Sequence, residues 1–124
     1  MGRGIASCLL SHGLEVIAYN RTAKRAKASV AHIEASLEEL VRRKMVPRAR
    51  IRNWRERFRL VASIAELAPS RFVIESVKED LELKRQLYAQ LEPAVAEDVV
   101  IASNTSSLPI SVLQSGRKCP ARFR

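Results

Sequence analysis

Short apolar runs alternate with longer helical patterns along this chain, and that alternation leaves few folds open to it. The runs span residues 15–19, 58–61, 72–77 and 99–102. Strands buried on both faces read as nearly continuous apolar runs, because neither side of the sheet meets water. The order strand, helix, strand, helix therefore predicts an α/β fold with a parallel sheet and helices on both of its faces.

The intervening segments have the spacing of helices. Residues 2–12 predict a first helix with Ile5, Leu9 and Leu10 on one side, and Gly13 provides its stop. Thr22 is a suitable N-cap for a long helix that ends by about Met45. Further helical segments are expected within 50–57, at 64–67, from the capping residue Asp80 to about Glu92, and from Pro109 to Gln114.

Two polar segments follow directly after apolar runs. One contains Glu79 and the other contains Ser106. In an open parallel sheet, ligands bind beyond the carboxyl ends of the strands, so both residues are placed for chemistry. Glu75 lies inside its run, where a carboxylate is costly unless it is hydrogen-bonded. We expect Glu75 near the same crevice, holding a loop backbone.

The formal net charge of +9 is concentrated in one segment. Residues 42–59 contain nine basic residues and one acidic residue, Glu56. Trp54 and Phe58 are too few aromatics for a base-stacking platform, and no helix-turn-helix or zinc spacing is present, so we expect no nucleic-acid partner. Three interpretations remain open: a solvated face, a surface for the phosphates of coenzyme A, or a nucleic-acid or membrane surface.

Cysteines and hydropathy point to a soluble, reduced protein. Cys8 and Cys119 have no metal-ligand partner at useful spacing and form no disulfide framework, so we expect no metal and a cytoplasmic location. No apolar run is long enough to cross a bilayer, and the first residues lack a secretory leader, so no membrane partner is expected. His12 and His32 lie in helical patterns and are expected to be ordinary surface or half-buried histidines.

Two segments carry a resemblance to a known family. They are Phe72-Val-Ile-Glu-Ser-Val-Lys-Glu-Asp-Leu-Glu-Leu-Lys84 and Ile101-Ala-Ser-Asn-Thr-Ser-Ser-Leu108. In type, order and separation they resemble the NAD-binding domain of the 3-hydroxyacyl-CoA dehydrogenases. The resemblance implies a Rossmann-like doubly wound parallel sheet over residues 1–124, with a long helical insertion facing coenzyme A at about 22–57.

The resemblance assigns four residues to the cofactor besides Ser106. Gly2 matches the third glycine of a Gly-x-Gly-x-x-Gly fingerprint, and Glu79 and Lys84 match family residues that line the NAD site. Asn20 stands where the family usually has an Asp that binds the adenosine ribose. Because Asn carries no charge to repel a 2′-phosphate and Arg21 follows it, NAD is expected but NADP stays open.

Each of these residues also has a structural interpretation. Gly2 can belong to a flexible start, Asn20 to a turn, and Lys84 to the solvent-facing side of an amphipathic helix.

The same resemblance assigns residues to the substrate. Ser106 matches the catalytic serine that binds the 3-oxygen of the substrate and also contacts the cofactor, and Asn104 is expected to shape its loop. Ser36 and Arg43 match positions that contact coenzyme A, where Arg replaces a Lys that is frequent in the family and adds a forked phosphate donor. The alternative interpretation of residues 104–107 is a capping turn that leads into the helix at Pro109.

The resemblance covers nearly the whole chain and only the middle of a larger enzyme. The first two fingerprint glycines, the strand before them, and the His-x-x-Asn-Pro motif that carries the general base are not in the sequence. We therefore expect a fragment that is inactive and marginally stable by itself. The missing strand would lie centrally, between the strand that ends at Tyr19 and the strand that contains Val73.

The implied reaction is the reversible NAD-dependent oxidation of 3-hydroxyacyl-CoA to 3-oxoacyl-CoA, as in fatty acid β-oxidation, by an enzyme that is a homodimer when complete. Two other functions stay open. One is an NADP-dependent dehydrogenase of the 3-hydroxyisobutyrate type, which shares the Asn-Arg-Thr segment at residues 20–22. The other is a basic nucleic-acid-binding module.

Overall fold

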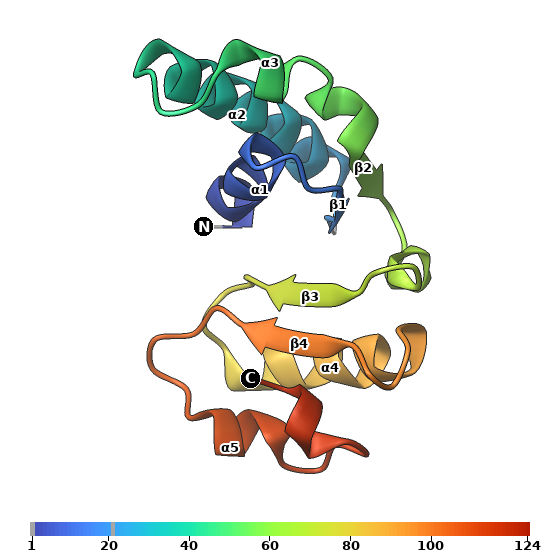
Figure 1. Cartoon of the computed structure of the whole chain (residues 1–124). Helices are drawn as coiled ribbons and strands as arrows, with labels where there is room; N and C mark the ends of the chain where they lie inside the picture. The colour runs from blue at the N-terminus through green and yellow to red at the C-terminus, as the bar shows by residue number, and fades with distance from the viewer. Residues whose placement is uncertain (1, 21) are drawn as a thin grey trace. The chain divides into compact units, whose positions relative to one another are not determined.

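The computed structural model describes residues 2–20 and 22–124, which form two compact units, Met1–Ala62 and Ser63–Arg124. Both units contain a pair of parallel strands (Figure 1). Within the described residues the strands form two separate two-stranded sheets. The predicted α/β class is confirmed, because the strands of each pair are parallel and helices accompany them.

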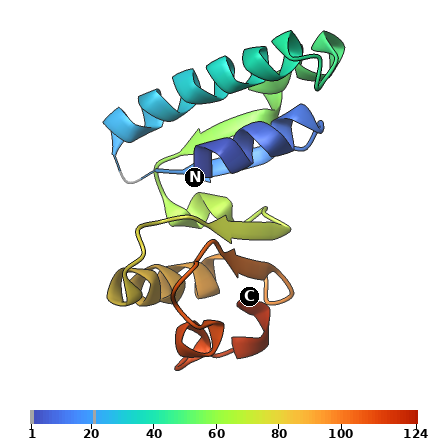
Figure 2. The same cartoon turned by 90° about the vertical axis from the view of Figure 1, so that its left-hand side faces the viewer.

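The first unit is a strand–helix–strand arrangement preceded by a helix. Its elements are α1 (Gly2–Ser11), β1 (Val16–Tyr19), α2 (Ala23–Arg42), α3 (Arg48–Ile51), the 3-10 helix η1 (Trp54–Arg57) and β2 (Phe58–Val61). Strands β1 and β2 pair in parallel, with Val16 opposite Phe58 and Tyr19 opposite Val61. Figure 2 shows the length of α2 beside the shorter α1.

Capping and glycine chemistry set the ends of these helices. The Thr22 hydroxyl accepts from the Arg25 amide at 3.3 Å, which confirms the predicted N-cap of α2. Gly13 has φ +85°, a left-handed conformation that glycine adopts without strain, and its amide donates to the Leu10 carbonyl where α1 ends. The two main helices of the first unit, α1 and α2, therefore begin and end close to the expected residues.

The core of the first unit lies between α1, α2 and the α3–η1 segment. It consists of six buried residues: Ala6, Leu10, Ile33, Leu37, Ile51 and Trp54. Ile33 and Leu37 lie four positions apart on α2 and so share the helix face that packs into this core. Cys8, also on α1, is exposed.

The second unit contains η2 (Ile64–Leu67), β3 (Phe72–Glu75), α4 (Leu81–Ala94), β4 (Val100–Ser103), α5 (Ile110–Gln114) and η3 (Pro120–Arg122). Strands β3 and β4 are parallel, with Phe72 opposite Val100 and Glu75 opposite Ser103. The final residues run beside β4, because the Arg124 amide donates to the Ile101 carbonyl at 3.0 Å.

The rings of Tyr88 and Phe123 pack in the core of this unit with centroids 5.0 Å apart. The apolar composition of β3 predicted burial on both faces, but Phe72 is 55% exposed and Ile74 is 37% exposed.

Candidate functional site

The candidate site lies at the carboxyl ends of β3 and β4, inside the second unit. Because Glu75 and Ser103 are opposite each other in a parallel pair, the loops that follow them leave the same edge of the sheet. The Asn104 amide donates to the Glu75 carbonyl at 2.8 Å, and the Asn104 side-chain amide donates to the Ser76 hydroxyl at 3.1 Å. Asn104 thus joins the two loops through its backbone and its side chain.

Glu75 lies at the buried inner end of this site. Its carboxylate accepts hydrogen bonds from the Val77 amide at 2.6 Å, from the Ser103 hydroxyl at 2.8 Å and from the Tyr88 hydroxyl at 2.9 Å. The bond to Val77 holds the loop backbone, as the sequence predicted. Burial raises the pKa of the Tyr88 phenol well above its ordinary value, so that this group stays protonated and donates.

Lys84 is fully buried in the first turns of α4. Its ammonium group lies 2.9 Å from Glu75 Oε2 and 3.5 Å from Glu79 Oε2, and it also donates to the Ser103 hydroxyl at 3.2 Å. The interpretation of Lys84 as a solvent-facing charge is therefore wrong. Asp80 accepts from the Leu83 amide at 3.0 Å and caps α4, which orients the first turns that carry Lys84.

Glu79 holds the loop that contains Ser106. Its Oε1 accepts from the Ser106 amide at 3.1 Å, from the Ser107 amide at 3.1 Å and from the Ser107 hydroxyl at 3.0 Å, and also from the Thr105 hydroxyl. These donors, the Thr105 hydroxyl foremost, lower the pKa of the Glu79 carboxyl to about 2. The Glu79 carboxylate is therefore ionised at neutral pH.

Ser106 is exposed. Its backbone amide is hydrogen-bonded to Glu79, whereas its hydroxyl is not. Within residues 2–20 and 22–124 that hydroxyl has no hydrogen-bond partner. Residues 104–107 form a turn that leads toward α5, but no side chain caps that helix at Pro109. The turn is closed instead by the Leu108 amide, which donates to the Thr105 hydroxyl at 3.1 Å.

The other predicted site residues belong to the first unit. Gly2 is the exposed first residue of α1, and Asn20 is half-buried directly after β1. Ser36 is half-buried and Arg43 is exposed, the former within α2 and the latter at its C-terminal end. Arg21, which bears on the choice between NAD and NADP, lies outside the described residues.

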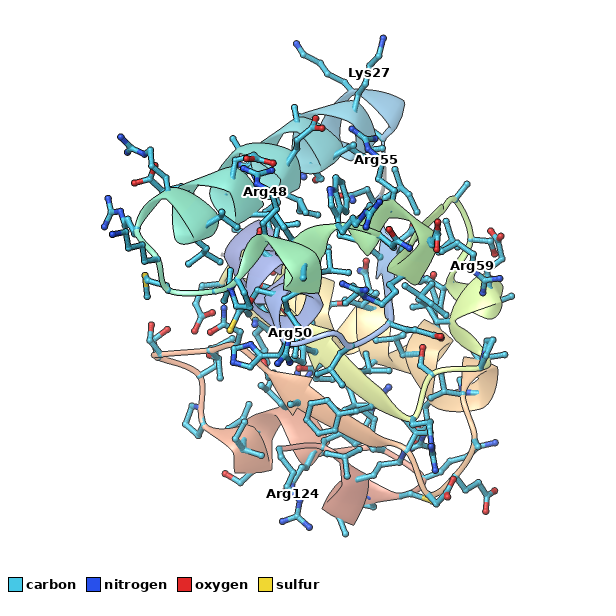
Figure 3. The ribbon with its side chains drawn as sticks, turned by 45° about the horizontal axis from the view of Figure 1, so that its top comes forward. Lys27, Arg48, Arg50, Arg55, Arg59 and Arg124 are labelled. Atoms are coloured by element: carbon cyan, nitrogen blue, oxygen red, sulfur yellow. The ribbon has the colours of Figure 1, made fainter. Side chains whose placement is uncertain are left out.

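Much of the basic segment is paired with acidic residues of α2. Arg48 binds Glu38 at 2.7 Å, Arg55 binds Glu34 at 2.7 Å, and Arg42 and Arg43 both bind Glu39 at 2.5 Å. Figure 3 shows Arg48 and Arg55 beside α2. This pairing supports the interpretation of a solvated face for part of the segment and reduces the positive charge that a polyanion would meet.

The predicted set omitted three residues that carry the geometry of the site: Tyr88, Ser103 and Thr105. A signal existed for Tyr88, since it follows Lys84 by four positions and so shares its face of α4. Ser103 is the last residue of β4 and lies within the recognised segment at residues 101–108, but it was given no role there. The role of Thr105 depends on a contact with Glu79, 26 residues earlier, which no local pattern indicates.

Among the residues that the structure describes, no group of three or more His, Cys, Asp or Glu side chains is arranged to hold a metal ion. No helix described there is long and apolar enough to cross a membrane.

Comparison with known proteins gives the context of this site. The family model of the 3-hydroxyacyl-CoA dehydrogenase NAD-binding domain matches residues 1–124. The 3-hydroxyadipyl-CoA dehydrogenase of Escherichia coli is 33% identical over 122 residues, which are 98% of this chain and 26% of the relative. A 3-hydroxybutyryl-CoA dehydrogenase of Mycobacterium tuberculosis is 33% identical over 129 residues, covering 98% of this chain and 43% of the relative.

Solved structures agree with the sequence comparison. The crystal structure of 3-hydroxybutyryl-CoA dehydrogenase from E. coli superposes with a TM-score of 0.91 at 32% identity, covering 99% of this chain and 26% of that one. The (S)-3-hydroxybutyryl-CoA dehydrogenase of Ralstonia eutropha gives a TM-score of 0.91 at 31% identity, with 99% and 44% covered. This chain thus spans less than half the length of these relatives and has the Rossmann-type fold of their NAD-binding domains. It belongs to the family of 3-hydroxyacyl-CoA dehydrogenase NAD-binding domains.

Proposed function

We propose that this chain is the cofactor-binding part of an enzyme that reversibly oxidises 3-hydroxyacyl-CoA to 3-oxoacyl-CoA with NAD. The observation that carries the proposal is the state of Ser106, whose amide is anchored by Glu79 while its exposed hydroxyl is unoccupied. A hydroxyl held in this way can hydrogen-bond the 3-oxygen of a substrate and orient it for hydride transfer. This substrate class is supported by the relatives, which are named as dehydrogenases of 3-hydroxyadipyl-CoA and 3-hydroxybutyryl-CoA.

The residues present fit a dinucleotide. The N-terminus of α1 has no acidic side chain in its first turn, so its amides are available to a pyrophosphate. Gly2 begins that helix, and Asn20 directly follows β1, where its carboxamide can bind a ribose hydroxyl. NAD supplies the hydride acceptor when it is bound. We assign three residues to the cofactor: Asn20, Glu79 and Lys84. The Lys84 ammonium is buried, so it acts indirectly, by pairing with the Glu79 carboxylate.

We assign no residue of this sequence to the removal of the proton from the substrate's 3-hydroxyl group. His12 and His32 are both exposed. Ser106 is proposed to bind and orient the oxygen, and Asn104 to keep the two loops joined during the reaction.

Coenzyme A is proposed to contact α2 through Ser36 and Arg43. These residues are seven positions apart, which is two helical turns, so they lie on one side of the helix. Arg43 Nε binds Glu39, and this contact leaves the other nitrogens of the Arg43 guanidinium available for a phosphate.

The first experiment measures cofactor binding by a hybrid enzyme, in which these 124 residues replace the matching segment of the E. coli 3-hydroxyadipyl-CoA dehydrogenase. NADH and NADPH are titrated and followed by their own fluorescence. We expect NADH to bind more tightly, and the Asn20→Asp variant to widen the preference by repelling the 2′-phosphate. Binding of neither nucleotide would argue against the proposal. Tighter binding of NADPH would favour an NADP-dependent dehydrogenase.

The second experiment measures turnover in the same hybrid enzyme. Ser106→Ala is expected to lower kcat about 100-fold, as loss of an oxygen-binding donor does, while Ser115→Ala at an exposed position serves as the matched control. Equal turnover of the two variants would remove Ser106 from the site.

The hybrid enzyme also tests the coenzyme A surface. Arg43→Ala is expected to raise KM for a CoA thioester about tenfold, and to leave KM for a truncated thioester without the nucleotide unchanged. Arg42→Ala is the matched control, because Arg42 shares the Glu39 partner. Equal effects on both thioesters would favour the solvated-face interpretation.

A further inference from the structure

Thr105 has two roles in the loop after β4 that no other side chain there combines. Its hydroxyl donates to Glu79 Oε1, and the same oxygen accepts from the Leu108 amide at 3.1 Å. A hydroxyl has one proton and two lone pairs, so both bonds can form at once. The first bond links the loop to the segment after β3, and the second closes a turn that encloses Ser106 and Ser107.

The Glu79 carboxylate divides its two oxygens between the loop and the core. Oε1 receives the Thr105 hydroxyl, the Ser106 and Ser107 amides and the Ser107 hydroxyl. Oε2 faces the Lys84 ammonium at 3.5 Å, and Lys84 is itself held by buried Glu75 at 2.9 Å. The Glu79 carboxylate therefore connects a rigid, buried ion pair to an exposed loop.

We propose that Thr105 is the positioning residue of Ser106. It fixes the turn from both ends, through Glu79 on one side and Leu108 on the other, so that the Ser106 hydroxyl stays directed toward substrate. This inference rests on the function proposed above, since it assumes that the Ser106 hydroxyl binds substrate. The hydroxyl is what matters and the methyl group does not, so serine is expected to replace threonine and valine is not.

The neighbouring serine provides a discriminating comparison. The Ser107 hydroxyl donates to the same Glu79 oxygen at 3.0 Å but does not bind Leu108. If any donor to Glu79 were enough, Ser107→Ala and Thr105→Val would have equal effects. If turn closure is the decisive feature, Thr105→Val has the larger effect.

The test uses the full chain and its variants Thr105→Val, Thr105→Ser, Ser107→Ala and Thr22→Val. Thr22 is the other threonine of the sequence and also accepts from a backbone amide, but at the N-cap of α2. Hydrogen exchange by NMR at neutral pH is expected to be about tenfold faster at Ser106 and Leu108 in Thr105→Val, the factor for losing one hydrogen bond. Thr105→Ser is expected to match the parent protein, Ser107→Ala to change less, and Thr22→Val to leave these amides unchanged.

A second measurement follows the Glu79 carboxyl carbon through an acid titration. Its pKa is expected near 2 in the parent protein and in Thr105→Ser, and nearer to the ordinary 4.5 in Thr105→Val, because the Thr105 hydroxyl is the largest cause of the low pKa. If Thr105→Val does not fold, the parent protein and Thr105→Ser still decide. Three results would overturn the inference. The first is an unprotected Leu108 amide in the parent protein, and the second is an ordinary Glu79 pKa in the parent protein. The third is exchange of the loop amides in Thr105→Ser that is as fast as expected for a loop without the hydroxyl.

Turnover of the hybrid enzyme separates this inference from the proposed function. Thr105→Val is expected to lower kcat at least tenfold, with a smaller change in KM, and Thr105→Ser to restore it. A hybrid with the parent sequence that shows no dehydrogenase activity counts against the proposed function, while the exchange and titration results still decide whether Thr105 fixes the loop. Normal kcat in a folded Thr105→Val hybrid would overturn the positioning role.

Discussion

Glu75 is an ionisable side chain among buried residues, and the bonds that it accepts explain why it can lie there. Its carboxylate is bonded to the Val77 amide, the Ser103 and Tyr88 hydroxyls and the Lys84 ammonium. A buried charge is tolerated when its lone pairs are satisfied in this way, and it becomes costly when one partner is removed. Lys84 is the partner that balances the charge.

Lys84→Met is therefore expected to destabilise the protein by about 3–5 kcal/mol, because the Glu75 carboxylate is left buried and unpaired. The double variant Glu75→Gln/Lys84→Met removes both charges and is expected to recover part of that loss. Urea unfolding followed by circular dichroism measures both free energies. A double variant as unstable as Lys84→Met alone would show that the pairing of charges is not what matters here.

The pH dependence of the loop follows from Glu79. Its folded pKa of about 2 lies below the ordinary 4.5, so the carboxylate is stabilised by the fold. That contribution is fully present above about 4.5 and is lost as pH falls through 4.5 toward 2. We expect the Ser106 and Ser107 amides to lose protection in that interval, measured by exchange, and Glu79→Gln to show reduced protection that no longer changes with pH there. Protection in the parent protein that does not depend on pH would contradict this.

At the scale of elements, α4 depends on contacts at both of its ends. Asp80 caps its N-terminus through the Leu83 amide. Near the other end, the buried Arg122 guanidinium donates to the carbonyls of Val99 at 2.9 Å and Ala96 at 2.5 Å, just beyond the last turn. The first turns matter most for the site because Lys84 lies there.

Asp80→Ala is expected to cost about 1 kcal/mol of stability, the usual value of an N-cap, and Asp80→Asn to cost less because its side-chain oxygen still accepts. Thermal unfolding measures the difference between the two variants. The Glu79 pKa is expected to stay low in both, since the donors to its carboxylate come from residues 105–107. A Glu79 pKa that rises in Asp80→Ala would mean that the cap also holds the loop.

At the scale of the whole molecule, each of the two units has buried residues of its own. In the first unit Leu37 is completely buried in the cluster that contains Trp54, the single tryptophan of the sequence. Trp54 fluorescence therefore reports on the core of the first unit.

Leu37→Ala is expected to destabilise the first unit by about 2–5 kcal/mol, as measured by Trp54 fluorescence in urea. Leu14→Ala is the matched control, because Leu14 is 52% exposed, and a change within about 0.5 kcal/mol is expected. Amide exchange of Ile101 in β4 is expected to change less than the fluorescence transition. Equal destabilisation at both probes would show that the two units unfold together.

The sequence by itself determined the class of the fold, the element order, the N-caps at Thr22 and Asp80, and the segments that contain Glu79 and Ser106. These properties depend on apolar periodicity, capping and glycine stops, which act over a few residues and so can be read locally. Tertiary structure decided that Lys84 is buried between two glutamates, that Thr105 connects two loops, and that Phe72 and Ile74 are exposed. These properties depend on the register of β3 with β4 and on contacts between residues about 26–28 positions apart, and the pattern of neighbouring residues does not encode such contacts.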